Sequence, residues 1–371
     1  MRGIVSALCL VGFVFGGIAM AADPVVIGAY LPMTGNVASY GQMGWDGITM
    51  AKKIEPTVLN RPVEVKLVDT KSDKGDAANA VSRLIENEKV LALIGEMISS
   101  NTIAGAARSE PRRIPMVSPT ATNPIVTQGK KYVFRVCFID SDQGPAAAKL
   151  AMNELKAKTA GIIYDVAQDY SVALAKFFKE AFVKEGGKIV GEQMFKSGDR
   201  EFTAQLATLK AANPDVLYAP IYYTECALIV KQARQMGMKS AFVVGDGVAV
   251  PEFLELGGPH AEGVYLTTHF HRDMITTDRG KKFLELWEKE QKKDLDAFVA
   301  MSADAYFILL DAMKRAGSTD PDKIREALVA TKDFEGVSGK ITMKPNGDPL
   351  KAMVVCKVKD GKFSYVTTIN P

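Results

Sequence analysis

Short apolar runs alternate with longer amphipathic segments in the first part of the chain. The expected strands are residues 25–31, 63–70, 90–95 and 114–119, and the expected helices are residues 40–54, 76–87 and 100–109. Strands that alternate with helices in this way are typical of βαβ units, in which helices cover both faces of a parallel sheet. The pattern therefore predicts a doubly wound α/β unit.

The same alternation restarts after Gly144, so a second unit follows the first. Its expected strands are residues 159–165, 188–195, 215–221 and 241–245, and its expected helices are residues 144–156, 170–186, 201–212 and 225–237. The two units should divide between Cys137 and Gly144. We therefore expect two successive doubly wound units in an α/β fold.

The last part of the chain does not repeat the pattern a third time. It offers a strand at 262–270, helices near 278–292, 297–316 and 321–331, and short strands at 339–343, 352–358 and 363–369. Asp320-Pro321 marks the start of the third of these helices, because proline is well suited to the first helical turn. These elements must pack on the units already formed, so we expect both domains to be discontinuous in sequence.

Length and composition agree with a protein of two domains. The chain has 371 residues, which is more than one ordinary hydrophobic core holds. Its apolar fraction of 47% and charged fraction of 24% are those of a soluble globular protein. The net charge is only +3, and basic clusters such as Arg112-Arg113 and Lys281-Lys282 lie among acidic residues. The chain lacks the basic face that a nucleic-acid partner usually needs, so we expect no such partner.

The first 21 residues have a different composition from the rest. Arg2 is the only charged residue before Asp23, residues 4–18 are almost wholly apolar or glycine, and Ala19-Met20-Ala21 fits a small-x-small cleavage pattern. A membrane anchor is the alternative, but the apolar region is shorter than the roughly 20 residues of a membrane span. We expect residues 1–21 to be a signal peptide that is cleaved near Ala21.

Three cysteines follow this segment, namely Cys137, Cys226 and Cys356. They are odd in number, lie far apart and form no C-x-x-C pair, so the pattern gives no support to a zinc site. Export would permit a disulfide, but a chain of this length does not need one. We interpret all three as buried thiols that pack as small hydrophobic side chains.

Four small polar side chains crowd together after the expected strand at 90–95. They are Ser99, Ser100, Asn101 and Thr102, and an expected helix begins among them. Side chains of this kind accept hydrogen bonds from the free amides of a first helical turn, so they can cap the helix. The same free amides and the helix dipole also favour a bound anion.

A second hydroxyl-rich segment follows the strand that ends at Ser118. It contains Thr120 and Thr122. In open α/β sheets, ligands bind at the carboxyl ends of the strands, where the strand order reverses. Because two neighbouring strands both end in hydroxyl groups, an anion-binding site is favoured over simple capping at Ser99.

The second unit offers different side chains at its strand ends. Asp246 lies between two glycines after one strand, Tyr222 and Tyr223 follow another, and Tyr170 follows a third. An aspartate in such a turn often only bonds its own backbone, and tyrosines at strand ends are often amphipathic surface. Together, however, these residues suit a ligand with a carboxylate, an ammonium group and an apolar side chain.

Sequence motifs of enzymes are absent. The chain has no G-x-G-x-x-G, no G-x-x-x-x-G-K-[ST] and no G-x-S-x-G, so dinucleotide, P-loop and hydrolase sites are unsupported. His269 and His271 form an H-x-H pair, but no carboxylate or cysteine motif completes a metal site around it. Asp294 and Asp296 are interpreted as part of a solvated turn. We expect no catalytic residues, no metal and no cofactor.

Five blocks of the sequence resemble the periplasmic substrate-binding proteins of branched-chain amino-acid ABC transporters, of the leucine/isoleucine/valine-binding type. These blocks are IGAYLPMTGNVASYGQ, SPTATNP, FRVCFIDSDQGPAAAK, YDVAQDY and VGDGVA. The resemblance implies a type I periplasmic binding fold, with two Rossmann-like lobes joined by a hinge of three segments. The implied lobes are residues 22–138 with 270–345, and residues 139–269 with 346–371.

The resemblance also implies a set of ligand-binding residues. Ser99 falls where the family binds the α-carboxylate, and Thr122 falls where a threonine contacts both the carboxylate and the ammonium group. Thr120 matches a position of backbone contacts. Asp246 falls where leucine-binding members carry a glutamate for the ammonium group. The positions of pocket aromatics are matched by Tyr40, Tyr170, Tyr222 and Phe298.

The sequence departs from the family pattern in three ways. Asp246 is one methylene shorter than a glutamate, and Thr120 is bulkier than the usual residue. The first-lobe disulfide of some relatives is absent, because Ser72 and Ile98 occupy its positions. These departures leave the side-chain preference of the ligand site open.

The resemblance implies a monomeric protein of the periplasm that captures a branched-chain or other apolar amino acid and delivers it to ABC permease subunits in the inner membrane. In this mechanism the first lobe binds the ligand, the second lobe then supplies Asp246 and Tyr222, and the permease recognises the closed shape. The alternatives are a clamp that reports a ligand to a receptor, a binder of a non-amino-acid carboxylate or amide, and a two-domain α/β enzyme.

Overall fold

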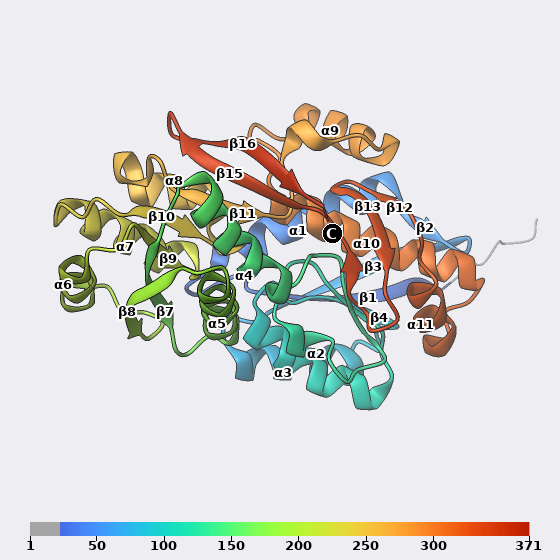
Figure 1. Ribbon diagram of the computed structural model, residues 1–371. Coiled ribbons are helices and arrows are strands. Elements are labelled where there is room, and N and C mark those ends of the chain that lie inside the picture. Colours follow the sequence, from blue (N-terminus) through green and yellow to red (C-terminus); the bar gives the residue numbers. More distant parts are fainter. Residues whose placement is uncertain (1–22, 371) are drawn as a thin grey trace, which may run out of the picture.

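The computed structural model describes residues 23–370 and contains two large sheets, each with helices on its faces (Figure 1). The expected signal peptide, residues 1–21, lies outside the described residues. The first sheet has the strand order β2-β3-β1-β4-β5-β6, and all its neighbours are parallel except β2 and β3. The strands are β1 (Val25–Leu31), β2 (Thr57–Val58), β3 (Arg61–Asp69), β4 (Ala92–Gly95), β5 (Met116–Ser118) and β6 (Val133–Arg135).

Helices from both ends of the chain cover the first sheet. On one side α2 packs against α3, and on the other side α1 packs against α10, which comes from the last part of the chain (Figure 1). These helices are α1 (Ala38–Ile54), α2 (Lys74–Glu86), α3 (Ser99–Ser109) and α10 (Ala297–Ala316). Gly47 permits the close packing of α1 on α10, because a Cβ atom there would lie 2.3 Å from the carbonyl oxygen of Val299.

The second sheet has the strand order β16-β15-β11-β10-β9-β7-β8, in which β15 and β16 are antiparallel additions to a parallel sheet. Its strands are β7 (Thr159–Asp165), β8 (Lys188–Phe195), β9 (Val216–Ala219), β10 (Ala241–Val244), β11 (Tyr265–Thr268), β15 (Met353–Lys359) and β16 (Lys362–Ile369). Its helices are α4 (Asp140–Lys149), α5 (Asp169–Lys184), α6 (Thr203–Ala212), α7 (Tyr223–Gln235) and α8 (Pro251–Gly257).

A smaller group of elements lies beside α10. It consists of α9 (Asp278–Glu290), α11 (Pro321–Val329), β12 (Phe334–Gly336), β13 (Gly339–Met343) and β14 (Pro349–Leu350). The three strands form a separate antiparallel sheet. These elements contact α1 and α10, so the chain returns to the first sheet after it has built most of the second.

The chain passes between the two large sheets at three places, namely residues 136–139, 269–271 and 351–352. Two of these crossings are in contact, because the ring of Phe138 packs on the ring of His269 with centroids 4.1 Å apart. Within residues 23–370, no helix is long and apolar enough to cross a membrane. Cys137, Cys226 and Cys356 are free and buried, which confirms the interpretation of these residues as packed thiols.

Most elements lie where the sequence pattern predicts them. Five coincide residue for residue, namely β1, β7, β8, α10 and β13. The helix predicted from Gly144 is wrong at its start, because α4 begins at Asp140 and contains Pro145 within its second turn. Elements β6 and α8 were not predicted, because segments of three and seven residues are too short to show a clear period.

Candidate binding site

Two loops of the first sheet lie side by side at its carboxyl edge, because β4 and β5 pair in parallel. The hydroxyl of Ser118 donates to the carbonyl oxygen of Glu96 at 2.7 Å, and the hydroxyl of Thr120 donates to that of Met97 at 3.1 Å. These bonds join the loop that follows β4 to the loop that follows β5. They therefore fix two of the segments from which binding residues were predicted.

The hydroxyl groups at the start of α3 do not cap that helix. Its N-cap residue is Ile98, which makes no side-chain cap bond, so the capping prediction is wrong. The Oγ of Ser99 instead accepts a hydrogen bond from the backbone N–H of Asn123 at 3.2 Å, and the Oγ of Ser100 accepts one from that of Asp169 at 2.9 Å. The two serines thus connect α3 to a neighbouring loop and to the second sheet.

A buried carboxylate, that of Glu96, supports the loop before α3. It accepts hydrogen bonds from the backbone N–H of Ile98 at 2.6 Å, the hydroxyl of Thr70 at 2.6 Å and the side-chain amide of Asn101 at 3.0 Å. Burial raises the pKa of Glu96 to about 7, and the hydrogen bonds oppose this shift. Sequence reasoning missed this residue, although an acid directly after a buried apolar strand was a signal.

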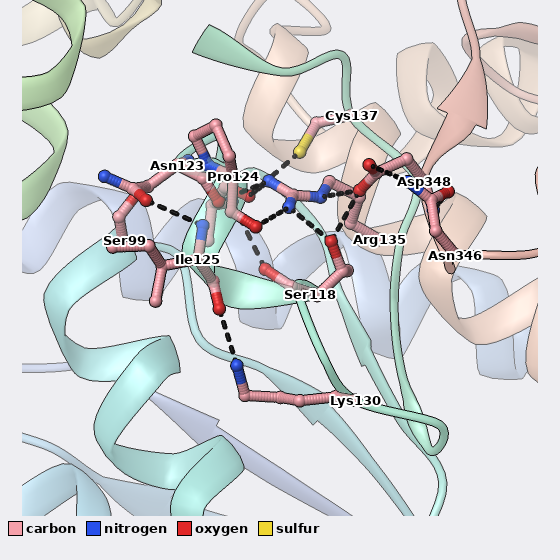
Figure 2. A network of polar contacts seen from close by, with 12 residues as sticks. Ser99, Ser118, Asn123, Pro124, Ile125, Lys130, Arg135, Cys137, Asn346 and Asp348 are labelled. Atoms are coloured by element: carbon pink, nitrogen blue, oxygen red, sulfur yellow. Dashed lines mark hydrogen bonds and ion pairs between the residues drawn. The ribbon is translucent and has the colours of Figure 1, made fainter. Parts of the chain in front are cut away.

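Arg135 supports the loop that contains Thr122 through hydrogen bonds to the backbone of that loop (Figure 2). This arginine is 0% exposed, and its Nη1 donates to the carbonyl oxygens of Ala121 and Asn123 at 2.8 and 2.9 Å. Its Nε lies 2.8 Å from Oδ1 of Asp348, which follows β13. Because the two carbonyls flank Thr122, Arg135 sets the position of that residue.

Asp246 is held by three donors on the second sheet's side. Its Oδ1 accepts hydrogen bonds from Nε2 of Gln143 at 2.8 Å and from the hydroxyl of Tyr170 at 3.1 Å, and its Oδ2 lies 3.0 Å from Nε2 of His269. A carboxylate has about four lone-pair sites. Three are used here, so Asp246 is fixed in place and can accept one further hydrogen bond.

Aromatic side chains from both sheets meet beside Asp246. Tyr170 and Tyr222 stack with centroids 5.2 Å apart, and Tyr40 stacks on Phe298 with centroids 4.3 Å apart. The hydroxyl of Tyr40 also donates to the carbonyl oxygen of Gly247. Burial is the main cause that raises the pKa of Tyr40, Tyr170 and Tyr222 well above the usual value, so all three hydroxyls remain protonated donors.

All eight predicted binding residues line one cavity between the two sheets. Its ten lining residues are Tyr40, Met97, Ser99, Thr120, Thr122, Tyr170, Tyr222, Asp246, Gly247 and Phe298. None of the eight is more than 9% exposed, and the empty space among them is ≈ 210 Å³. A larger hollow of ≈ 1420 Å³ lies along α4 and β16, is open to solvent and contains none of the eight.

Two of the predicted residues carry a buried polar atom that has no hydrogen-bond partner among residues 23–370. They are the hydroxyl of Thr122 and the hydroxyl of Tyr222. Buried polar atoms are nearly always hydrogen-bonded in proteins. Their position in the cavity wall indicates a place where a ligand supplies the missing partners.

Sequence reasoning did not find the residues that surround Asp246. Gln143 lies in the block FRVCFIDSDQGPAAAK, where the resemblance implies no role for it, and in sequence His269 stands out only as half of an H-x-H pair. In the structure His271 lies apart from this cluster, 3.4 Å from a carboxylate oxygen of Asp273. Among the described residues, no group of three or more His, Cys, Asp and Glu side chains is placed to hold a metal ion.

Asp296 does not belong to a solvated turn, so that interpretation is wrong for this residue. It is the N-cap of α10, and its Oδ1 accepts a hydrogen bond from the backbone N–H of Val299 at 2.9 Å. Burial raises its pKa to about 7, which the bond to Val299 and the charge of Lys293 oppose. Asp294 is exposed and pairs with Arg272 at 3.1 Å.

Comparison with known proteins identifies the family. A family model described as "Periplasmic binding protein" matches residues 24–362. The chain is 29% identical to a leucine-, isoleucine-, valine-, threonine- and alanine-binding protein of Pseudomonas aeruginosa, over 92% of this chain and 91% of that protein. Its structure is similar to that of a leucine-binding protein of Thermotoga maritima, with a TM-score of 0.92 and 46% identity, over 94% of this chain and 99% of that one.

A second solved structure gives the same assignment. It is a branched-chain amino-acid transporter substrate-binding protein of Streptococcus pneumoniae in complex with isoleucine, with a TM-score of 0.88 and 29% identity, over 94% of this chain and 100% of that one. These likenesses confirm the predicted fold of two α/β lobes. The chain belongs to the periplasmic binding protein family, a family of transport binding proteins and not of enzymes.

Proposed function

We propose that the protein captures an amino acid with a branched-chain or other apolar side chain between its two lobes and delivers it to an ABC permease. The observation that carries this proposal is the meeting of eight predicted residues, from five separate strand ends and two helices, in one enclosed cavity. The names of the similar proteins, which bind leucine, isoleucine and related amino acids, support the same ligand class.

The wall of the cavity suits the three parts of such a ligand. The hydroxyls of Ser99 and Thr122 and the free amides at the start of α3 can receive a carboxylate, since a helix N-terminus favours negative charge. The one free lone pair of Asp246 can accept a hydrogen bond from an ammonium group. The rings of Tyr40 and Phe298 then face the apolar side chain.

Entry of a ligand requires the lobes to part. The residues that line the cavity are buried, and only ≈ 10 Å³ of its empty space could hold water, far less than the roughly 300–1,000 Å³ of typical small-molecule pockets. Hydrogen bonds also join the lobes at the rim, where Nδ2 of Asn36 donates to Oε1 of Glu225 at 2.7 Å and Nδ2 of Asn123 donates to the carbonyl oxygen of Asp169 at 2.8 Å. The closed shape is the form that a permease would recognise.

The proposed lobes are residues 22–138 with 270–345 and residues 139–269 with 346–371, a division that keeps each large sheet within one lobe. Because β14 pairs with β13, we place the third crossing at residues 351–352, so that residues 346–350 stay with the first lobe. We further propose that the protein is a monomer of the periplasm from which residues 1–21 are removed. N-terminal sequencing of protein from its native host should begin at Ala22 or Asp23.

Mass spectrometry of ligand released from freshly purified, denatured protein tests the ligand class. It should identify an apolar amino acid, and calorimetry with a panel of L-amino acids should show reversible binding. Solution scattering should then show a smaller radius of gyration with that amino acid than without it. Release of a simple carboxylate or an amide instead, or turnover of the bound compound, would replace the proposal with one of the alternatives.

A further inference from the structure

Asp140 is a buried carboxylate that lies beside the candidate binding site and has no hydrogen bond. It is the first residue of α4, it is 0% exposed, and neither of its carboxylate oxygens has a partner among residues 23–370. A buried ionisable group without a hydrogen bond destabilises a fold, and unexplained groups of this kind concentrate at functional sites. The side chain therefore requires a functional explanation.

The first turn of α4 connects Asp140 to both halves of the site. The backbone N–H of Asp140 donates to the carbonyl oxygen of Thr122 at 3.0 Å. One turn later, Nε2 of Gln143 donates to Oδ1 of Asp246 at 2.8 Å. Burial, and after it the negative charge of Asp246, raise the pKa of Asp140 well above its usual value, while Thr122 and Arg135 oppose the shift.

Two basic side chains in this region, Arg135 and His269, are already engaged. The guanidinium group of Arg135 bonds two backbone carbonyls and pairs with Asp348, as Figure 2 shows. The imidazole of His269 faces the other carboxylate, that of Asp246. Within residues 23–370, Asp140 thus has no salt-bridge partner.

Other buried acceptors without partners gather around the same two carboxylates. They include the hydroxyl oxygens of Thr122 and Tyr218 and the side-chain oxygen of Gln143. The charges of Asp140 and Asp246 both act on Tyr218, which places this tyrosine beside them. Such a concentration of acceptors suits a group with several N–H donors, and an ammonium group has three.

We propose that Asp140 is a second acidic residue of the ligand site and acts together with Asp246 on the ammonium group of the ligand. This inference rests on the proposed function and deepens it. The site then selects zwitterionic amino acids over carboxylates that lack an amine, because only an ammonium group supplies N–H donors to the unpaired acceptors around Asp140 and Asp246. Arrival of the ammonium group favours the ionised form of Asp140, so binding releases a proton in the pH range where empty protein holds one.

The ionisable groups that act on Asp140 come from several elements. They are Asp246 after β10, Arg135 at the end of β6, Tyr170 of α5, Tyr218 of β9, Tyr222 before α7, and Cys137 of the first crossing. The tyrosines and the cysteine have pKa values raised by burial, so they stay neutral between about pH 5 and 8. Proton release in this range can therefore be compared directly between native protein and an Asp140 variant.

Asp140→Asn tests the proposal, with Asp142→Asn as the matched control. Asp142 lies two residues later in the same helix, but it is exposed and lines the solvent-open hollow along α4. With L-leucine as the probe, we expect Asp140→Asn to raise the Kd at least about tenfold. With 4-methylpentanoate, which lacks the amine, its affinity should be unchanged or higher. Asp142→Asn should change neither Kd by more than about twofold.

A second measurement follows the proton that ligand binding releases. Calorimetry of L-leucine binding in two buffers with different ionisation enthalpies, repeated from pH 5 to 8, should show proton release by native protein and less release by Asp140→Asn. Equal affinities of native protein and Asp140→Asn for L-leucine would overturn the role of Asp140 and leave the proposed function intact. If native protein binds no amino acid, both the proposed function and this inference are wrong.

Discussion

Nε2 of His269 lies 3.0 Å from Oδ2 of Asp246, and neither side chain is exposed by more than 5%. The imidazole ring also packs on Phe138. Because His269 and Phe138 belong to two of the three crossings between the lobes, the carboxylate proposed to bind the ligand's ammonium group is in contact with the hinge itself. A movement of the lobes therefore changes the surroundings of Asp246 directly.

Asp246→Asn should weaken L-leucine binding by about one to two decades, because a hydrogen bond to a charged group contributes roughly 1.5–3 kcal/mol. Binding of 4-methylpentanoate should change little, since that compound has no ammonium group to pair. Titration calorimetry on the four combinations forms a double-mutant cycle. If native protein binds the analogue as tightly as L-leucine, the ammonium role of Asp246 is wrong.

Ser99→Ala should have a smaller effect, about one decade or less in the Kd for L-leucine. The substitution removes one hydroxyl, while the backbone amides of α3 and the hydroxyl of Thr122 remain for the carboxylate. The backbone N–H of Asn123 also loses its acceptor, so part of the effect comes from a less ordered loop. A loss larger than that of Asp246→Asn would contradict this ranking.

Asn36→Ala should weaken ligand binding, although Asn36 does not itself contact the ligand. The side chain of Asn36 donates to Glu225 across the two lobes, and this bond forms only when they are closed. We expect L-leucine to dissociate about tenfold faster, with an unchanged melting temperature of the empty protein. Asn87→Ala, at an exposed end of α2, is the control. Stopped-flow dissociation rates that match those of native protein would rule out a role for this bond in closure.

Asp348→Ala should lower the free energy of unfolding by about 3–5 kcal/mol, because it leaves the buried charge of Arg135 without a counter-ion. Glu64→Ala breaks an exposed pair with Lys66 and should leave stability nearly unchanged, because solvent screens that pair. Urea titrations measure both values. Similar losses for the two variants would show that Arg135 does not depend on its buried partner.

The half-buried Asp296 should make stability depend on pH. Its pKa is raised to about 7 in the folded state from about 3.9 in the unfolded chain, so folded protein holds the extra proton. Its contribution to stability is fully present below about pH 4 and is lost as the pH rises through about 7.

Asp296→Asn isolates this contribution, since asparagine also caps a helix well but does not titrate. The stability of native protein relative to the variant should fall by roughly 2 kcal/mol between pH 4 and pH 8, a value that allows for partial exposure. Urea titrations at both pH values measure it. A constant difference between the two proteins would contradict the raised pKa.

The residues found from sequence are those whose place follows from strand ends alone. Ser99 and Asp246 each come directly after a buried strand, and parallel strands bring such ends to one edge of a sheet. Gln143 and His269 could not be found in this way, because their contact with Asp246 depends on how α4 and β11 pack. Asp140 shows the same limit, since a buried acid at the start of a helix looks like an ordinary first-turn acid in sequence.

The capping pattern also failed to predict the hydrogen bonds of the serines at the start of α3, because residues distant in sequence replaced the expected partners. The serines at the start of α3 follow the pattern of a helix cap, yet their hydroxyls accept bonds from Asn123 and Asp169. Glu96 takes the Ile98 amide instead. The sequence pattern thus predicted the right segment for the site and the wrong partners for its hydroxyls.

The packing of α10 on α1 has a consequence for biosynthesis. The first lobe needs residues 297–316 to cover one face of its sheet, and Arg135 needs Asp348 for its charge. A growing chain therefore exposes an uncovered apolar face until almost all of it has left the ribosome. Contacts between residues so far apart also form slowly. The first lobe consequently cannot reach its native packing before residues 297–316 have been synthesised.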